Sequence, residues 1–298
     1  MLEFAFKKMD AFTTGLSSGN PAGYVDLDTA PLPSAEVMQK IAAELKGFVN
    51  EVGYVSRQKE QLTLRFYSSE CEVAFCGHAT IAIMYDLLKN SPELQSESEV
   101  FITVQAGTLS VFNRIQEENA VYIMAPPPAF LERQLSPSAI AEALGVGQDS
   151  LDAQMSCQVV DGGLRTLIVP LRTLEDCLAL QPNQERLRLF CLANDFDIVH
   201  VSSRETVSSA HQYRTRVFAP KYGYLEDPAT GSGNSAFCYY LIKNGVWQND
   251  FSVEQGPSRN NPNIVKLKRY AKDGEARVLF GGCATTRIDG KYCLHAFG

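Results

Sequence analysis

One stretch near residue 80 constrains the fold more than any other part of the chain. Residues 71–90 read CEVAFCGHATIAIMYDLLKN, a tight turn at Cys76-Gly77-His78 followed by a helical segment that is apolar on nearly every face. A helix of that kind cannot lie on a protein surface, because it has no polar face to present to water. The sequence therefore predicts a buried central helix that is wrapped by sheet.

The same pattern returns near the other end of the chain. Subtracting 77 from 231 gives an offset of 154, and at this offset six residues of the first segment meet identical residues of the second: Gly77, Ala82, Tyr85, Leu87, Lys89 and Asn90. Upstream, Arg65-Phe66-Tyr67 resembles Arg216-Val217-Phe218. We interpret this similarity as an internal duplication, so a second central helix is expected after residue 231.

Both predicted helices begin with small residues, GHAT at 77–80 and GSGN at 231–234. Small residues leave the first backbone N–H groups of a helix uncovered at the positive end of its dipole, where an anion can bind. The simpler alternative is that Thr80, Ser232 and Asn234 only cap their helices. Two matched copies favour a shared site for a carboxylate or phosphate group.

Composition and charge exclude several classes of protein. The 298 residues suffice for about two domains, and 45% hydrophobic with 20% charged residues is typical of a globular protein. A net charge of −7, with 27 scattered Lys and Arg, argues against nucleic acid or an anionic membrane as a partner. No stretch approaches the roughly 20 apolar residues of a membrane span, and the start MLEFAFKKMD lacks the order of a signal peptide. We therefore expect a cytoplasmic protein that acts on small solutes.

The eight cysteines are expected to be free thiols, because a cytoplasmic compartment is reducing. Zinc sites usually take ligands from closely spaced pairs such as Cys-x-x-Cys. The nearest approach to such a pair is Cys71 and Cys76, with His78 beyond. From this spacing we predict no metal site.

The remaining pattern predicts the domain organisation. Pro126-Pro127-Pro128 cannot extend a sheet and forms a stiff connector, so we place the domain boundary there. The expected domains are 1–125 and 126–285, with the last strands, 286–298, packing back on the first domain. Ser34 and Ser136 are each predicted to start a further helix.

The end of the chain is predicted to form a hairpin. Gly281-Gly282 is expected to break a strand. A final pair of strands, at 284–288 and 292–296, is expected to turn at Asp289-Gly290.

Glu51 lies in the strand-like run FVNEVGYV at 48–55. Successive side chains of a strand point to opposite faces, so Glu51 could face either an apolar interior or water. The residues alone slightly favour the wet face, because a carboxylate is easily solvated there.

Six motifs, found in order along the whole chain, carry a resemblance to a known family. They are GNPAG at 19–23, NEVGYV at 50–55, RFYSSECEVAFCGHAT at 65–80, RVFAP at 216–220, EDPATGSG at 226–233 and QGPSR at 255–259. Together they resemble the PhzF-like phenazine-biosynthesis family, and CGHAT and EDPATGS are the specific ones. The resemblance implies the diaminopimelate-epimerase-like α+β fold, with two pseudo-symmetric domains that each wrap a curved, mostly antiparallel sheet around a central helix.

The resemblance also implies a function. It predicts an isomerase, acting as a homodimer, that moves a proton within a small carboxylic-acid metabolite by general acid/base catalysis in a cleft between the domains. No cofactor or metal is implied. The expected catalytic residues are Glu51 as general acid/base, with His78 and Asp227. The expected substrate-binding residues are Gly77, Ser232, Gly231, Gly233, Cys76 and Asn20.

The sequence departs from the family pattern at two places. Epimerases of this fold use two cysteines on opposite faces of the substrate, whereas here Cys76 has no counterpart in the second motif, which offers Asp227-Pro228. The chain also reads Asn50-Glu51-Val52 where the family more often has Ser-Glu-Thr. These departures argue against a two-cysteine racemase.

Two alternatives to the isomerase stay open. One is an enzyme that uses Cys76 as nucleophile and His78 as base, although residues two apart at a helix start are not expected to face each other. The other is a non-catalytic protein of the same fold that binds a small acid.

Overall fold

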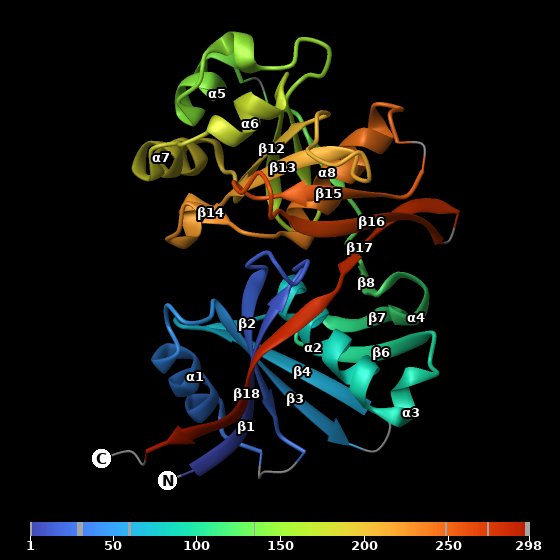
Figure 1. The fold of residues 1–298 in the computed structure, drawn as a ribbon. Coiled ribbons are helices and arrows are strands. Elements are labelled where there is room, and N and C mark those ends of the chain that lie inside the picture. Colours follow the sequence, from blue (N-terminus) through green and yellow to red (C-terminus); the bar gives the residue numbers. More distant parts are fainter. Residues whose placement is uncertain are drawn as a thin grey trace. The chain divides into compact units, whose positions relative to one another are not determined.

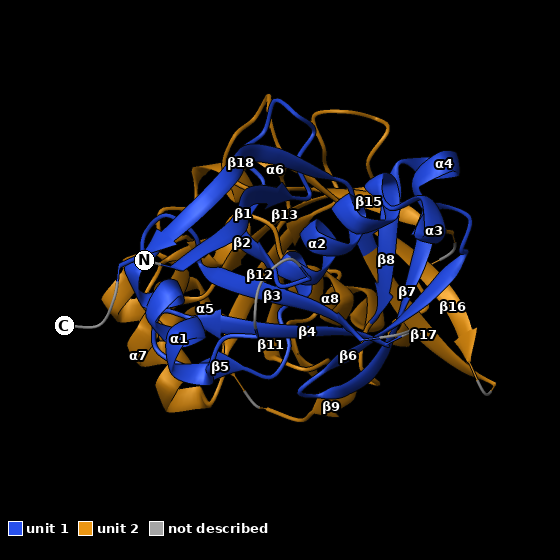
Figure 2. Cartoon of the chain, turned by 90° about the horizontal axis from the view of Figure 1, so that it is seen from below, with its two compact units in different colours: residues 1–124, 281–298 blue, residues 125–280 orange. Residues whose placement is uncertain are grey.

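The computed structural model describes residues 2–28, 32–58, 61–133, 135–247, 249–272 and 274–295 (Figure 1). The chain divides into two compact units, coloured separately in Figure 2: unit 1 is Met1–Met124 with Gly281–Gly298, and unit 2 is Ala125–Phe280. Each unit combines helices with one curved sheet.

Unit 1 holds one sheet and two longer helices. Its elements are β1 (Leu2–Ala11), β2 (Asn20–Asp26), α1 (Ala35–Glu44), β3 (Glu51–Gln58), β4 (Gln61–Ser68), β5 (Glu72–Val73), α2 (Gly77–Asn90), α3 (Pro92–Gln95), β6 (Glu99–Val104), β7 (Gly107–Arg114), α4 (Ile115–Glu118), β8 (Ala120–Met124) and β18 (Ala284–Leu294). The strands lie in the order β18, β1, β2, β3, β4, β6, β7, β8, with β5 paired to β4. All neighbours are antiparallel except β2–β3 and β4–β6.

Unit 2 has the same plan. Its elements are β9 (Ala129–Leu131), α5 (Pro137–Leu144), η1 (Gln148–Ser150), β10 (Gln158–Asp161), β11 (Arg165–Pro170), α6 (Leu174–Ala179), α7 (Gln184–Asn194), β12 (Ile198–Ser203), β13 (Tyr213–Phe218), η2 (Pro220–Tyr222), β14 (Glu226–Asp227), α8 (Gly231–Lys243), β15 (Phe251–Gln255), β16 (Asn263–Lys272) and β17 (Glu275–Gly282), whose last two residues belong to unit 1. The strand order is β9, β10, β11, β12, β13, β15, β16, with β14 paired to β13.

The two sheets repeat each other strand by strand. The parallel pairs β2–β3 and β4–β6 of unit 1 correspond to β11–β12 and β13–β15 of unit 2. A parallel pair needs a crossover connection, which is α1 between β2 and β3, and α6 with α7 between β11 and β12. The predicted α+β class and internal duplication are confirmed.

The central helices are buried as the sequence predicts. Every residue of α2 from Ala79 to Leu88 is buried, and α2 contacts β1, β2, β3, β8 and β18. In Figure 2, α2 lies inside the curve of these strands. Ten residues of α8 are buried, and α8 contacts β10, β11, β12 and β16. Each large apolar side chain buried in this way contributes about 1.5–3 kcal/mol relative to an exposed one.

The predicted starts of two flanking helices are confirmed. The Ser34 hydroxyl accepts a hydrogen bond from the Val37 N–H at the start of α1. The Ser136 hydroxyl does the same for the Ala139 N–H at the start of α5.

The predicted C-terminal hairpin is wrong. β18 runs straight through Asp289-Gly290 and pairs antiparallel with β1, so that Asp289 lies opposite Lys7 and Gly290 opposite Phe6. The edge of β1 offers backbone hydrogen-bond partners along the whole length of β18. A hairpin would instead pair the two halves of this segment only with each other. β17 continues through Gly281 and ends at Gly282, so the predicted break lies at the end of this glycine pair. Residue 296 of the predicted strand lies outside the described residues.

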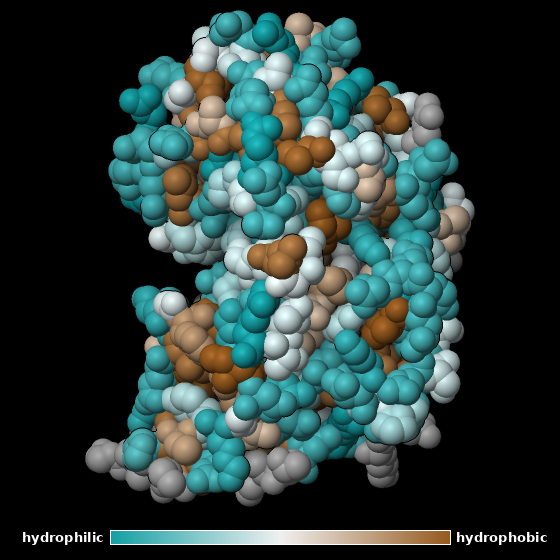
Figure 3. All heavy atoms as spheres, viewed as in Figure 1, coloured by the Kyte–Doolittle hydropathy of each residue, from teal (hydrophilic) through white to brown (hydrophobic). Residues whose placement is uncertain are grey.

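The surface in view is mostly hydrophilic, with hydrophobic residues in small separate groups (Figure 3). Among the residues that the structure describes, each helix falls short of the length and apolar character that a membrane-spanning helix needs.

Replacing Gly53 by Ala should destabilise unit 1, because α2 packs directly on β3 at this residue. A Cβ atom at Gly53 would overlap Ile83 Cδ1 and would lie 3.3 Å from the Phe66 ring, and both neighbours are fully buried. We expect Gly53→Ala to lower the free energy of unfolding by about 1–3 kcal/mol, measured by urea denaturation.

Two further variants control this prediction. Nothing lies within 4 Å of a Cβ added at Gly290, so Gly290→Ala should change the free energy of unfolding by less than about 0.5 kcal/mol. Ile83→Val removes the overlapping Cδ1 atom, so its combination with Gly53→Ala should cost less than the sum of the two single changes. Strictly additive losses would contradict the described packing of α2 on β3.

Candidate active site

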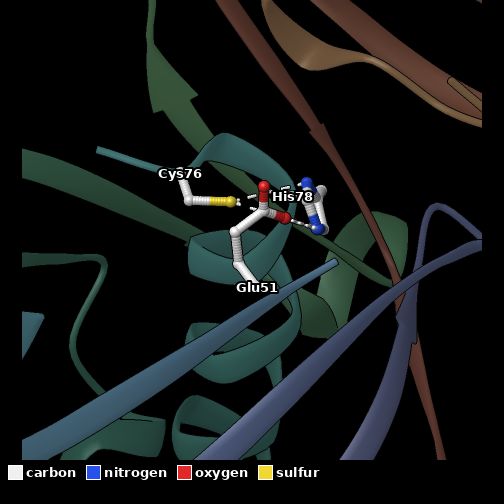
Figure 4. Close-up of side chains that lie close together, drawn as sticks. All are labelled: Glu51, Cys76 and His78. Atoms are coloured by element: carbon white, nitrogen blue, oxygen red, sulfur yellow. Dashed lines mark hydrogen bonds and ion pairs between the residues drawn. The ribbon is translucent and has the colours of Figure 1, made fainter. Parts of the chain in front are cut away.

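Three polar side chains of unit 1 converge at the start of α2. Glu51 is the first residue of β3, Cys76 is the N-cap residue of α2, and His78 lies in the first turn. Figure 4 shows their functional groups directed toward one another. His78 Nε2 lies 3.2 Å from Glu51 Oε2, and Cys76 Sγ lies 3.5 Å from His78 Nδ1.

The position of Glu51 follows from the packing of β3 on α2. Glu51 and Gly53 are two residues apart in the strand, so their side-chain positions share one face. At Gly53 this face meets Ile83 of α2. Glu51 therefore points toward the start of α2, and its side chain is 22% exposed. The alternative that Glu51 faces water on the outer side of the strand is wrong.

Cys76 and His78 face each other, contrary to the expectation from their spacing. That expectation assumed that both residues belong to the helix. Cys76 instead has an extended backbone, with φ −132° and ψ 109°, and precedes the first helical residue. Its side chain therefore leaves the chain in a direction that no helical residue has, and it reaches the His78 ring.

The electrostatics of the cluster follow from its burial. Glu51 Oε2 is buried and lies at ion-pair distance from His78, yet it is not aligned for a hydrogen bond with any partner. Burial raises the pKa of the Cys76 thiol, an effect that His78 only partly offsets. Burial alone would lower the pKa of His78, but its contacts with Cys76 and Glu51 outweigh burial and raise this pKa well above its usual value. Both shifts favour the protonated form of the group concerned.

The two central helices start in the same way. The Thr80 hydroxyl donates a hydrogen bond to the Cys76 carbonyl at 2.7 Å, and the Asn234 side chain donates to the Thr230 carbonyl at 2.8 Å. Thr80 and Asn234 are related by the offset of 154, as are Cys76 and Thr230. Thr80 and Asn234 therefore do not cap the N–H groups of their helices, and neither N-cap residue makes a side-chain capping bond.

The polar residues of unit 2 form a network at the start of α8. Asp227 ends β14, and its carboxylate accepts a hydrogen bond from the Thr230 hydroxyl at 2.5 Å. Gln255 Oε1 accepts from the Thr230 N–H at 2.9 Å and from Asn234 Nδ2 at 2.7 Å. Gln255 Nε2 donates to the Asp227 carbonyl at 3.0 Å. All four residues are buried, so this network fixes Asp227 rigidly.

The remaining predicted residues lie near these two groups, each within its own unit. Asn20 is buried at the start of β2, and Asn50 donates to its side-chain oxygen at 3.5 Å. Gly77 and Ser232 are half-buried at the starts of α2 and α8. A Cβ atom at Gly231 would overlap the Phe280 ring, and one at Gly233 would lie 3.3 Å from Ile198 Cδ1. Close packing thus accounts for Gly231 whether or not an anion binds there.

Sequence reasoning missed three members of the unit 2 network. From the sequence alone, no role was assigned to His200, Thr230 or Gln255. Gln255 lies in the QGPSR motif, which was the one signal that could have drawn attention to it. His200 Nε2 lies 3.0 Å from Asn234 Oδ1, and its ring stacks on Phe237 at 4.8 Å.

Comparison with known proteins gives consistent matches along nearly the whole chain. A family model described as phenazine biosynthesis-like protein, PhzC-PhzF, matches residues 9–290. The chain is 28% identical over 297 residues to the protein named uncharacterized isomerase YfhB of Bacillus subtilis, covering 97% of this chain and 99% of the relative. It is also 28% identical over 301 residues to antisense-enhancing sequence 1 of Schizosaccharomyces pombe, covering 98% and 99%.

Solved structures share the fold. A phenazine biosynthesis protein of the PhzF family from Bacillus anthracis superposes with a TM-score of 0.87 at 24% identity, covering 99% of this chain and 100% of that one. A hydroxyproline epimerase from Agrobacterium vitis superposes with a TM-score of 0.60 at 14% identity, covering 99% and 92%. The predicted two-domain epimerase-like fold is confirmed.

Acid should destabilise unit 2 through His200. Burial lowers the pKa of this fully buried ring to about 4, below the 6.5 expected in the unfolded chain. The folded state therefore prefers the neutral ring. The contribution of the neutral ring to the free energy of unfolding is complete above about pH 6.5 and is lost as the pH falls to about 4. A shift of that size corresponds to roughly 3 kcal/mol. Urea denaturation across this pH range measures the loss.

Other groups also titrate in this range, so the comparison is made with His200→Gln, which cannot be protonated. The fall in unfolding free energy between pH 6.5 and 4 should be shallower in the variant. Equal slopes in the two proteins would show that His200 is not the source.

Proposed function

Because this chain belongs to the phenazine biosynthesis-like PhzC-PhzF family, and is thereby an isomerase, we propose that it moves a proton within a small carboxylic-acid metabolite by general acid/base catalysis. Glu51 removes a proton from one carbon and returns it at another position. The reaction needs no cofactor. The observation that carries the proposal is the Glu51 carboxylate held 3.2 Å from His78 at the start of α2.

The surroundings of Glu51 suit a residue that has to both take and give a proton. Its Oε2 atom is buried beside His78, while the side chain as a whole is 22% exposed, so a substrate can reach the carboxylate. Glu51 starts a strand and His78 lies in the first turn of a helix, so both are held on rigid elements. General acid/base catalysis by one such group typically contributes 10²–10⁴ in rate.

His78 and the start of α2 supply positive charge beside Glu51. The raised pKa of His78 favours an imidazolium, which stabilises negative charge that develops on the substrate after proton removal. The first N–H groups of α2, left without a side-chain cap, suit a substrate carboxylate. By resemblance, Asp227 and Ser232 remain the proposed polar contacts from unit 2.

A thiol enzyme is the second candidate, and one observation favours it. Cys76 Sγ lies 3.5 Å from His78 Nδ1, within reach for proton transfer to the ring. The raised pKa of the Cys76 thiol argues against it, because the thiolate is the nucleophilic form.

Glu51→Gln should abolish proton exchange while leaving binding nearly intact, because it keeps the shape of the side chain and removes the base. Proton NMR in D2O, with a panel of small cyclic dienoic, amino and hydroxy acids, follows the loss of one carbon-bound proton signal. We expect the exchange rate of an accepted substrate to fall by about 10²–10⁴ in the variant.

Glu70→Gln is the matched control, since Glu70 is an exposed carboxylate that pairs with Lys46 and is not a member of the cluster. It should exchange at the wild-type rate. Unchanged exchange in Glu51→Gln would overturn the assignment of Glu51. Tight binding of an acid with no exchange, in the wild-type protein, would instead favour the non-catalytic alternative.

Cys76→Ala separates the isomerase from the thiol enzyme. If Glu51 transfers the proton, the variant should lose less than about tenfold in exchange rate, which is below the contribution of a general acid/base. A loss as large as that of Glu51→Gln would assign the chemistry to Cys76.

A further inference from the structure

Glu51, Cys76 and His78 also form the donor set of a metal site. We propose that they bind Zn²⁺ through Cys76 Sγ, a His78 ring nitrogen and a Glu51 carboxylate oxygen, and that the bound ion inhibits the protein. Their ligand atoms all lie within 4.8 Å of one another, and among the described residues no other group of three His, Cys, Asp or Glu does so. The spacing argument against a metal considered neighbours in sequence, and β3 brings Glu51 in from elsewhere.

The distances fit a tetrahedral ion. Zn–S bonds of about 2.3 Å and Zn–N and Zn–O bonds of about 2.0–2.2 Å place neighbouring ligand atoms about 3.4–3.6 Å apart. In the structure, Cys76 Sγ lies 3.5 Å from His78 Nδ1 and 3.9 Å from Nε2, and Nε2 lies 3.2 Å from Glu51 Oε2. With Nε2 as the ligating nitrogen, these separations lie close to the tetrahedral values, so the three donors are spaced for one ion.

The chemistry of the three donors favours zinc over a hard cation. A sulfur, an imidazole nitrogen and one carboxylate oxygen match the preference of Zn²⁺, whereas Mg²⁺ and Ca²⁺ prefer oxygen alone. The cluster is also not satisfied by its own contacts, because Glu51 Oε2 is buried without a hydrogen bond. Three protein ligands leave a fourth position open, as in zinc sites that also hold water or a small acid.

Binding is a ligand exchange without oxidation or reduction. The Cys76 S–H bond breaks as the Zn–S bond forms, and the proton passes to solvent. An imidazolium at His78 likewise releases the proton of its ligating nitrogen. Once bound, the ion coordinates the Glu51 carboxylate oxygen and the His78 imidazole. Neither group is then available for the proposed proton transfer. The inhibitory part of this inference therefore rests on the proposed function, whereas the site itself does not.

Cobalt and zinc titrations of the chelator-treated protein test the site directly. Co²⁺ should produce a thiolate-to-cobalt absorption band that saturates at one ion per chain, and Zn²⁺ should displace it. Loss of an outer-sphere partner typically lowers metal affinity by roughly 10–100-fold. The affinity for Zn²⁺ should fall by more than this in each of three variants: Cys76→Ser, His78→Gln and Glu51→Gln. Mg²⁺ in excess should not compete.

Two exposed thiols provide matched controls, since Cys71 and Cys293 lie outside the cluster. Cys71→Ser and Cys293→Ser should retain the site. Unaltered Zn²⁺ affinity in Cys76→Ser would overturn the proposal. Alkylation of Cys76 in the wild-type protein, mapped by mass spectrometry, needs no variant: Zn²⁺ should protect Cys76 from the reagent, and equal labelling with and without the ion would contradict the site.

Exchange measurements distinguish failure of the site from failure of the function. Saturating Zn²⁺ should suppress the exchange of an accepted substrate, and a chelator should restore it. Undiminished exchange at saturation would overturn the inhibition. Stoichiometric zinc with no exchange under any condition would support the site and count against the isomerase mechanism.

Discussion

A helix that is apolar on nearly every face has to be enclosed, and this requirement sets the architecture of both units. One flat sheet covers only one side of such a helix, so each sheet curves around it and draws in strands from distant parts of the chain. In unit 1, β18 extends the sheet beyond β1 to help enclose α2. For α2 to pack closely on β3, the strand needs a residue without a side chain at the point of contact. Gly53 is that residue, because the absence of a Cβ atom leaves room for Ile83.

Because the rest of the helix is enclosed, polar side chains are found mainly at its first turn. The helix body is sealed by apolar contacts, but its first N–H groups need a polar environment. In unit 1 this end carries Cys76 and His78 and meets Glu51 from the strand that packs on the same helix. The interaction that buries α2 therefore also places Glu51 beside His78, because Glu51 and Gly53 share one face of β3.

The features predicted from sequence were those with a local or repeated signal. The all-apolar helices, the duplication and the capped starts at Ser34 and Ser136 each follow from residues close together in the chain. The pairing of β18 with β1 could not be predicted, since the turn-forming pair Asp289-Gly290 is a strong local signal and the edge that overrides it lies far away in sequence. The contact between Cys76 and His78 was missed because it depends on the backbone angles of the residue before the helix. Side chains such as Gln255 have no periodicity to reveal them.

The two halves of the duplication have diverged where chemistry would require it. The residue equivalent to Cys76 is Thr230, whose hydroxyl is bound to Asp227, and the residue equivalent to His78 is Ser232. Racemisation needs two acid/base groups, one on each face of a carbon, so that the proton leaves from one side and returns on the other. Here unit 1 has a cluster with a thiol, whereas the start of α8 has one carboxylate, Asp227, which is held by Thr230 within a network of hydrogen bonds around Gln255. A single group that removes and returns the proton acts from one side of the substrate. Under the proposed function, the absence of a thiol at Thr230 supports proton transfer by Glu51 over a two-cysteine racemisation.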